Sequence, residues 1–200
     1  YPEVEAYVEK FLLGNSTANT NVTKSPYDLV DHQRWYEWWG TGEPSFPEPN
    51  LAGVESVWLE AECGSVGSDW EVIDSGQASN GKYVTAKAGT QSLSAAPTGS
   101  QGRLSLSFSI KKSGSFTIYA RMNCPTADDD SFWVKIDNEE FQMHNGLGTS
   151  NWQWKRLSNA TLSAGDHGLT IGLREDGAQL DKISISNYPY APQGMGDEAD

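Results

Sequence analysis

Apolar and polar residues alternate with a period of two along most of the chain after residue 55. Such alternation predicts strands with one buried face, and turn signals such as Asp137-Asn138 and Asp176-Gly177 separate the runs. Many short strands of this kind predict an all-β fold, an antiparallel β-sandwich. The clearest apolar positions are Leu104, Leu106, Phe108, Ile110, Phe116, Ile118, Phe132, Val134, Ile136, Leu169, Ile171, Leu173, Ile183 and Ile185.

The first fifty residues follow another pattern. Residues 1–13 carry apolar side chains at helical spacing and Gly14 follows as a stop, which predicts an amphipathic helix. An Asn/Thr-rich connector leads to an irregular Trp-rich segment over residues 32–39. We therefore divide the chain into a tail of a preceding domain (1–39), a Pro/Gly-rich linker (40–54), a β-sandwich (55–188) and a polar, frayed C-terminal tail (189–200).

The charge of the chain limits the classes of partner that it can bind. The formal net charge is −13 and no basic stripe interrupts the sequence, which argues against nucleic acid and against anionic membranes. No apolar run is long enough to span a bilayer. The chain opens within a predicted helix without an initiator Met, so we interpret it as a fragment of a longer precursor. We further expect a secreted protein and a monomer. The sequence does not decide whether Cys63 and Cys124 form a disulfide or stay as two separate thiols, and we treat the two cases as equal alternatives.

An ordered series of motifs resembles carbohydrate-binding modules of families 6 and 35. The series covers residues 57–187 and reads EAE, SNGKYV, SGSFTIYARMN, DDDSFWVKID, NWQWKRL and LSAGDHGLTIGLREDGAQLDKISIS. The resemblance implies a jelly roll that binds plant or algal polysaccharide and holds a structural Ca²⁺. Its metal ligands would be Glu60, Glu62 and Asp181, completed by backbone carbonyls of the Asn80–Lys82 turn, with Lys82 among them.

The carboxylates also suit calcium on chemical grounds. Calcium takes six to eight oxygen ligands, and side chains at i and i+2 of a strand project from one face, as Glu60 and Glu62 would. The alternative is that both simply point into solvent. The acidic run Asp128–Asp130 is likewise either a second ion site, a set of acceptors for sugar hydroxyls or a solvated loop.

Sugar recognition needs flat aromatic faces and planar polar groups. In loops at one end of the predicted sandwich, the candidates are Tyr83 and Trp152 for stacking and Asn123, Glu175 and Gln179 for hydrogen bonds.

Other aromatic and basic residues are less clear. Trp154 has core parity and is interpreted as packing, whereas Trp133 is either an exposed platform or covered by neighbouring chain. Arg174 and Lys182 would favour a uronic acid or else pair with nearby acidic residues.

The N-terminal segment resembles the C-terminal end of glucuronoyl esterases, carbohydrate esterase family 15, whose catalytic domain would precede Tyr1. The chain itself carries no G-x-S-x-G nucleophile elbow and no carboxylate pair placed as in a glycosidase. We therefore expect a non-catalytic module that binds polysaccharide, xylan or another uronic-acid-containing glycan among the candidates, and targets an attached esterase. The alternative is a structural sandwich that packs on the catalytic domain without binding glycan.

Overall fold

A computed structural model describes residues 53–188 and 190–199. The predicted N-terminal helix, the Trp-rich segment and nearly all of the linker lie outside these residues. None of the helices in the described ranges is long and apolar enough to cross a membrane.

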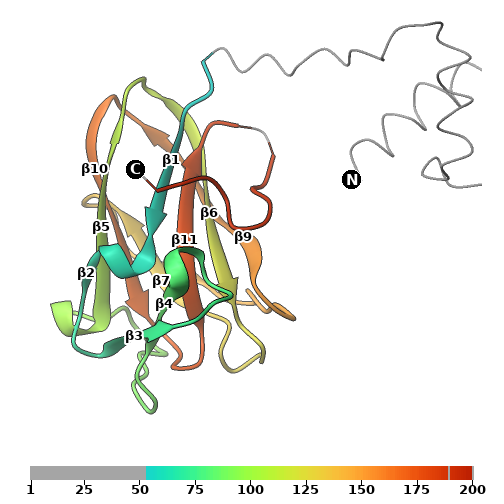
Figure 1. Cartoon of the computed structure of the whole chain (residues 1–200). Helices are drawn as coiled ribbons and strands as arrows, with labels where there is room; N and C mark the ends of the chain where they lie inside the picture. The colour runs from blue at the N-terminus through green and yellow to red at the C-terminus, as the bar shows by residue number, and fades with distance from the viewer. Residues whose placement is uncertain (1–52, 189, 200) are drawn as a thin grey trace, which may run out of the picture. The chain divides into compact units, whose positions relative to one another are not determined.

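Two antiparallel sheets make up the described domain, which confirms the all-β prediction (Figure 1). Sheet A has the order β3-β4-β11-β6-β9, with β1 also paired to β11, and sheet B has the order β2-β5-β10-β7-β8. The strands of sheet A are β1 (Ser56–Glu60), β3 (Trp70–Asp74), β4 (Lys82–Ala86), β6 (Gly114–Asn123), β9 (Gln153–Leu162) and β11 (Gln179–Ser186). Those of sheet B are β2 (Ser65–Val66), β5 (Arg103–Ile110), β7 (Phe132–Ile136), β8 (Gln142–His144) and β10 (Gly165–Leu173). Three-residue 3-10 helices lie at η2 (Ala61–Cys63), η3 (Ser79–Gly81) and η4 (Ser100–Gly102).

The predicted alternation sets the core. In β5 every second residue, from Leu104 to Ile110, is buried while the serines between them are exposed. The inward residues of both sheets form one hydrophobic cluster, as expected when two half-apolar sheets pack face to face. Cys124 belongs to this cluster, whereas Cys63 is exposed, and the two thiols are not bonded.

Bulges overturn the parity prediction for Trp154. The register of β9 on β6 shifts between Ile118 and Tyr119, so Leu157 points into the core and Trp154, paired with Arg121, lies on the outer face of sheet A. Trp154 does pack, as predicted, but against the C-terminal segment: its Nε1 donates to the carbonyl of Gly194 at 3.1 Å.

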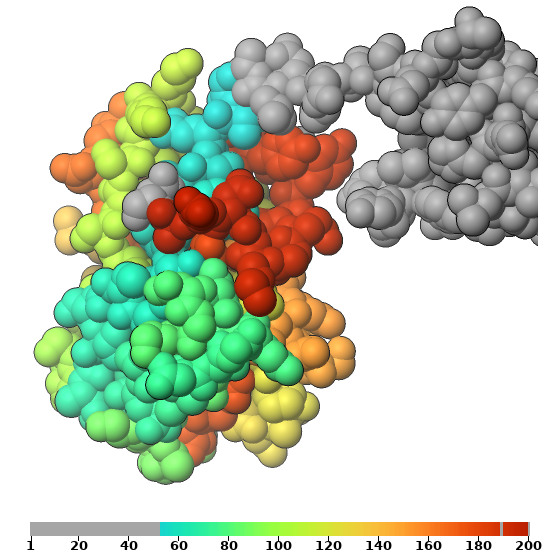
Figure 2. All heavy atoms as spheres, in the orientation of Figure 1, coloured from blue at the N-terminus to red at the C-terminus, as the bar shows by residue number. Residues whose placement is uncertain are grey.

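The C-terminal segment also differs from its prediction as a frayed tail. Residues 190–199 run back along the outer face of sheet A, where the dark red atoms of Figure 2 lie beside the blue-green atoms of β1. Polar composition suggested fraying, but the segment is held by its backbone carbonyls, which accept hydrogen bonds from Arg121, Trp154 and Lys182.

Candidate glycan-binding site

Four of the five predicted sugar-binding residues lie on four consecutive strands of sheet A. Tyr83 is on β4, Gln179 on β11 and Asn123 on β6, while Trp152 directly precedes β9. Tyr83, Gln179 and Asn123 each neighbour a core residue of their strand, so these three side chains point to the outer face. Trp152 precedes its strand and meets this face through its contact with Tyr83. All four are half-buried, the burial expected of groups that line a shallow open site.

Tyr83 and Trp152 form an aromatic corner. Their ring centroids lie 5.3 Å apart with the ring planes at 61°. A pyranose held between two parallel rings needs about 7–8 Å, two van der Waals spacings of about 3.5–4 Å each. The pair therefore offers two walls of a corner, and a sugar would rest its apolar face on one ring and its edge on the other.

An amide pair lies between the two aromatic residues in the strand order. Asn123 and Gln179 are cross-strand neighbours, and Asn123 Nδ2 donates to Gln179 Oε1 at 3.0 Å. Among the described residues, Asn123 Oδ1 and the Gln179 amide nitrogen keep one acceptor and two donors for other partners. Such a mixed set is able to bind two adjacent sugar hydroxyls.

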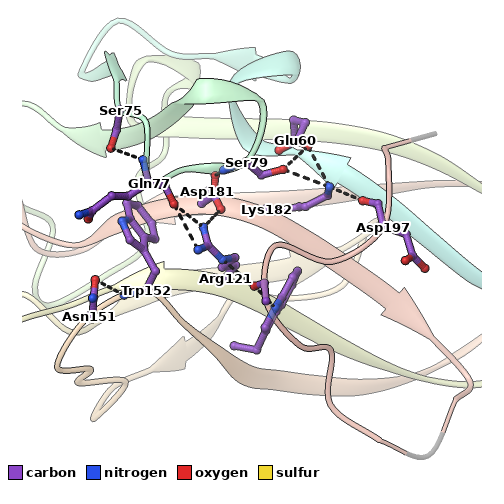
Figure 3. A network of polar contacts seen from close by, with 12 residues as sticks. Glu60, Ser75, Gln77, Ser79, Arg121, Asn151, Trp152, Asp181, Lys182 and Asp197 are labelled. Atoms are coloured by element: carbon purple, nitrogen blue, oxygen red, sulfur yellow. Dashed lines mark hydrogen bonds and ion pairs between the residues drawn. The ribbon is translucent and has the colours of Figure 1, made fainter.

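Arg121 supports the corner from beneath. Its guanidinium carbon lies 5.3 Å from the centroid of the Trp152 ring, and Figure 3 shows it reaching from β6 toward the loop that carries Gln77. Both terminal nitrogens donate to the Gln77 carbonyl at 3.2 Å, and Nη1 also pairs with the buried carboxylate of Asp181. The sequence analysis missed this role, because Arg121 has the ordinary parity of an outward strand residue.

Glu175 does not join the other four. It is 8% exposed, and its carboxylate accepts from the backbone N–H of Asp130 at 2.8 Å and from Arg174 at 2.5 Å. These contacts tie the loop before β11 to the acidic loop before β7. Glu175 therefore lies apart from the other four candidates, in a contact between two loops, and its role in sugar binding stays a prediction.

Trp133 and the loop that contacts it are weaker candidates for stacking. Trp133 is half-buried, and its Nε1 donates to the carbonyl of Ser92 at 2.8 Å. The loop containing Ser92 borders a cavity of about 510 Å³, with Leu173 at its base and no aromatic side chain in its lining. A polar cavity without a flat ring lacks the apolar face on which a pyranose stacks.

The three proposed calcium carboxylates lie close to the corner, on the far side of Arg121. Glu60 ends β1, and its Oε1 accepts from Ser79 Oγ at 2.7 Å and lies 3.0 Å from Lys182 Nζ. Glu62 is in η2 and not on the strand, so the i, i+2 argument does not describe it. Its Oε1 instead accepts from Asn80 Nδ2 at 2.9 Å.

Asp181 sits at a bulge of β11 and is fully buried. Its Oδ1 accepts from the backbone N–H of Ser79 at 2.8 Å, and its Oδ2 pairs with Arg121. Burial raises the pKa of Asp181 to about 6, although Arg121 opposes the shift. Burial also raises the pKa of Glu62. In both carboxylates, burial outweighs the nearby positive groups, Arg121 at Asp181 and Lys82 at Glu62, which favour the charged form.

Orphaned oxygens test whether these residues suit a cation. Glu60 Oε2 and Glu62 Oε2 are buried without a hydrogen-bond partner, and hard oxygen ligands of this kind suit Ca²⁺. Asp181 is less available because Arg121 and Ser79 occupy both of its oxygens. Lys82 pairs through its ammonium with Asp74 at 2.5 Å, so only its backbone carbonyl could be a ligand. In the described ranges, no three His, Cys, Asp or Glu side chains are already arranged as a metal site.

Neither a protein-family model nor a curated protein matches the chain. Solved structures share its fold. A β-(1,4)-mannanase from Podospora anserina, described as GH26-CBM35, has a TM-score of 0.53 at 15% identity over 68% of this chain and 29% of that chain. The C-terminal CBM6 of LamC, a marine laminarinase from Zobellia galactanivorans, has a TM-score of 0.50 at 16% identity over 66% of this chain and 100% of that module.

An exo-β-1,3-galactanase from Phanerochaete chrysosporium has a TM-score of 0.50 at 18% identity. The match covers 66% of this chain and 29% of the galactanase, so this chain spans less than a third of both enzymes and the whole of the isolated module. These likenesses confirm the predicted fold, an antiparallel β-sandwich that this chain shares with the CBM6 module and with parts of the two enzymes.

Proposed function

We propose that the β-sandwich is a non-catalytic module that binds polysaccharide at the Tyr83–Trp152 corner. The observation that carries the proposal is the row of Tyr83, Gln179, Asn123 and Trp152 across four adjacent strands. This row combines an apolar corner for a sugar face with two amide groups that, beyond the hydrogen bond between them, keep donors and an acceptor for sugar hydroxyls. The fold shared with carbohydrate-binding modules supports the same function.

The structure does not favour uronic acids over neutral sugars. Lys182 is buried against Glu60, and Arg174 is paired with Glu175. Arg121 is 7% exposed and is already engaged by Asp181. The cations that would have recognised an acidic sugar are thus used within the protein, and we expect neutral xylan or another neutral glycan to bind at least as well as a glucuronate-bearing one.

We keep two further elements of the sequence analysis within this proposal. The first is a structural calcium ion, for which Glu60 and Glu62 supply orphaned oxygens and Asp181 and the Lys82 carbonyl supply the remaining candidates. When bound, the ion would compensate negative charge: three buried or half-buried carboxylates face only the two buried cations Arg121 and Lys182. The second is the attachment of the module to a secreted cell-wall esterase, which rests on the resemblance of the N-terminal segment.

The corner would serve such an enzyme by proximity. A tethered module raises the effective concentration of its partner at an insoluble surface without any chemistry of its own. One aromatic corner and a few exposed hydrogen bonds offset little of the entropy lost on association, so we expect weak binding to a single sugar.

Affinity electrophoresis tests this function. The chain is run through gels that contain neutral xylan, glucuronoxylan, mannan, β-glucan, pectin or alginate. We expect retardation by at least one neutral glycan and its loss in Trp152→Ala. Trp133→Ala is the matched control, because it removes the same side chain from the opposite sheet. Absence of retardation in every gel, with the chain folded, would replace this proposal by the structural-module alternative.

A further inference from the structure

The C-terminal residues 190–199, here called the strap, contact the outer face of sheet A at three points. The carbonyl of Gly194 accepts from Arg121 Nε at 3.0 Å and from Trp154 Nε1 at 3.1 Å. The carbonyl of Asp197 accepts from Lys182 Nζ, as Figure 3 shows. Arg121 and Lys182 are buried cations whose carboxylate partners, Asp181 and Glu60, do not occupy all of their N–H donors. The strap therefore supplies carbonyl acceptors for donors that would otherwise be left without a partner.

Gly196 fits the strap against a pair of tryptophans. Its φ is +75°, a left-handed conformation that favours glycine. A Cβ at this position would lie 2.5 Å from Trp58 Cζ3 and 3.0 Å from Trp154 Cζ2. The backbone thus approaches the two indole rings as closely as only a glycine permits. Gly194 shares the left-handed φ, at +56°, yet a Cβ there meets nothing within 4 Å.

Arg121 joins the strap to the aromatic corner. One edge of its guanidinium donates to Gly194, the opposite edge donates to Gln77, and Nη1 pairs with Asp181. Its guanidinium carbon lies over the Trp152 ring, 5.3 Å from the ring centroid. Because the guanidinium is planar and rigid, partners around its rim fix the plane against which the indole rests.

We propose that the strap positions Trp152 through Arg121, so that the C-terminal residues are a working part of the corner. When the strap leaves, Arg121 Nε and Lys182 Nζ lose their carbonyl acceptors and the guanidinium is free to tilt toward solvent. Trp152 then loses the surface that holds its ring at 61° to Tyr83. The predicted effect on glycan binding rests on the proposed function. The positioning of Trp152 by the strap is independent of that function.

The test compares two alanine variants that share the backbone cost of a left-handed residue. Gly196→Ala adds the clash with the tryptophans, whereas Gly194→Ala adds none. The readout is the near-ultraviolet circular dichroism of Trp152, isolated as the difference between each protein and the same protein with Trp152→Phe. A chain truncated after Tyr188 removes the strap altogether, and thermal melts report whether each variant is folded.

We expect the Trp152 difference spectrum to collapse in Gly196→Ala and in the truncated chain and to persist in Gly194→Ala. With the glycan that retards the parent chain in the gel panel, Gly196→Ala should bind about three- to tenfold more weakly, the size of one lost cation–π support. A difference spectrum that is unchanged in a folded, truncated chain overturns the proposal. A changed spectrum with unchanged retardation overturns its link to binding. If no glycan retards the parent chain, the proposed function fails while the spectroscopic comparison still decides the role of the strap.

Discussion

Two aromatic pairs on the outer face of sheet A have nearly the same geometry and different surroundings. Tyr83 and Trp152 meet edge to face at 5.3 Å and 61°, and Trp58 and Trp154 meet edge to face at 5.7 Å and 75°. The second pair is crossed by the strap at Gly196. The first lies at the loop end of the strands beside the amide groups of Asn123 and Gln179.

The difference shows that residue type and ring geometry do not by themselves separate packing from recognition. The two pairs differ in the group that covers them. The backbone of the strap lies against Trp154, whereas Trp152 contacts the guanidinium of Arg121 on one side and is not covered by the strap. The two pairs are nevertheless linked, because Gly194 accepts from both Trp154 and Arg121. Substitutions can therefore be chosen to affect one pair, the other or both.

Arg121→Met should have the largest effect and should damage both pairs. The substitution leaves the buried carboxylate of Asp181 without its cation, and breaking a buried ion pair from one side costs about 3–5 kcal/mol of folding free energy. Chemical denaturation measures this loss. The double variant Arg121→Met/Asp181→Asn should recover part of it, because no bare charge then stays buried. A single variant within about 1 kcal/mol of the parent would contradict the ion-pair account.

Calcium should have the next largest effect, and it acts on the charge cluster that lies between the pairs. If the ion binds at Glu60 and Glu62, a free concentration one hundred times its dissociation constant stabilises the fold by about 2.7 kcal/mol. The melting temperature should therefore fall on chelation with EDTA, measured by differential scanning calorimetry. Glu62→Gln should melt at one temperature with or without calcium. If the melting temperature of the parent chain changed with neither calcium nor EDTA, the calcium ion would no longer be part of the proposal.

The strands and the core were predictable from the sequence, because alternation is a local signal. The run RLSLSFSI forms β5 with the predicted inward residues. The order of motifs shared with carbohydrate-binding modules led to Tyr83, Asn123, Trp152 and Gln179, which the structure brings together on sheet A, although three of them lie on strands and not in loops. Their role in sugar binding stays a prediction. The predictions for residues 1–39 stay predictions, since these residues lie outside the described structure.

What the sequence did not reveal depends on contacts between distant segments. The bulge that turns Trp154 outward arises where β9 pairs with β6. A simple alternation of apolar and polar residues does not reveal the extra residue that a bulge inserts. The strap has the polar composition of a disordered tail, yet its backbone carbonyls, which composition does not describe, hold it to Arg121 and Lys182. The sequence did not reveal the contact of Glu175 for a related reason: its partner Asp130 is 45 residues away.

Trp58→Ala should act directly on the covered pair and reach the Tyr83–Trp152 corner only through loss of the strap. Truncation of a buried large aromatic residue costs about 3–5 kcal/mol, and we expect about half of this at Trp58, which is half-buried beneath the strap. The melting temperature should fall, and limited proteolysis should cut residues 190–199 faster than in the parent. If the folded variant loses the strap, its retardation by glycan should weaken only by the three- to tenfold assigned to positioning. A complete loss of retardation would mean that Trp58 itself contacts the glycan.

Trp152→Ala should have the smallest effect on stability and a selective effect on binding. The side chain is half-buried and contacts the Tyr83 ring and the Arg121 guanidinium, so the fold should lose about 1 kcal/mol. Binding should weaken at least about tenfold, because the stacking wall is gone. Tyr83→Ala should do the same, whereas Tyr83→Phe keeps the ring and should bind nearly as the parent does. If Trp152→Ala destabilised the fold as much as Trp58→Ala and left retardation intact, the two pairs would both be packing, and the distinction drawn from their surroundings would fail.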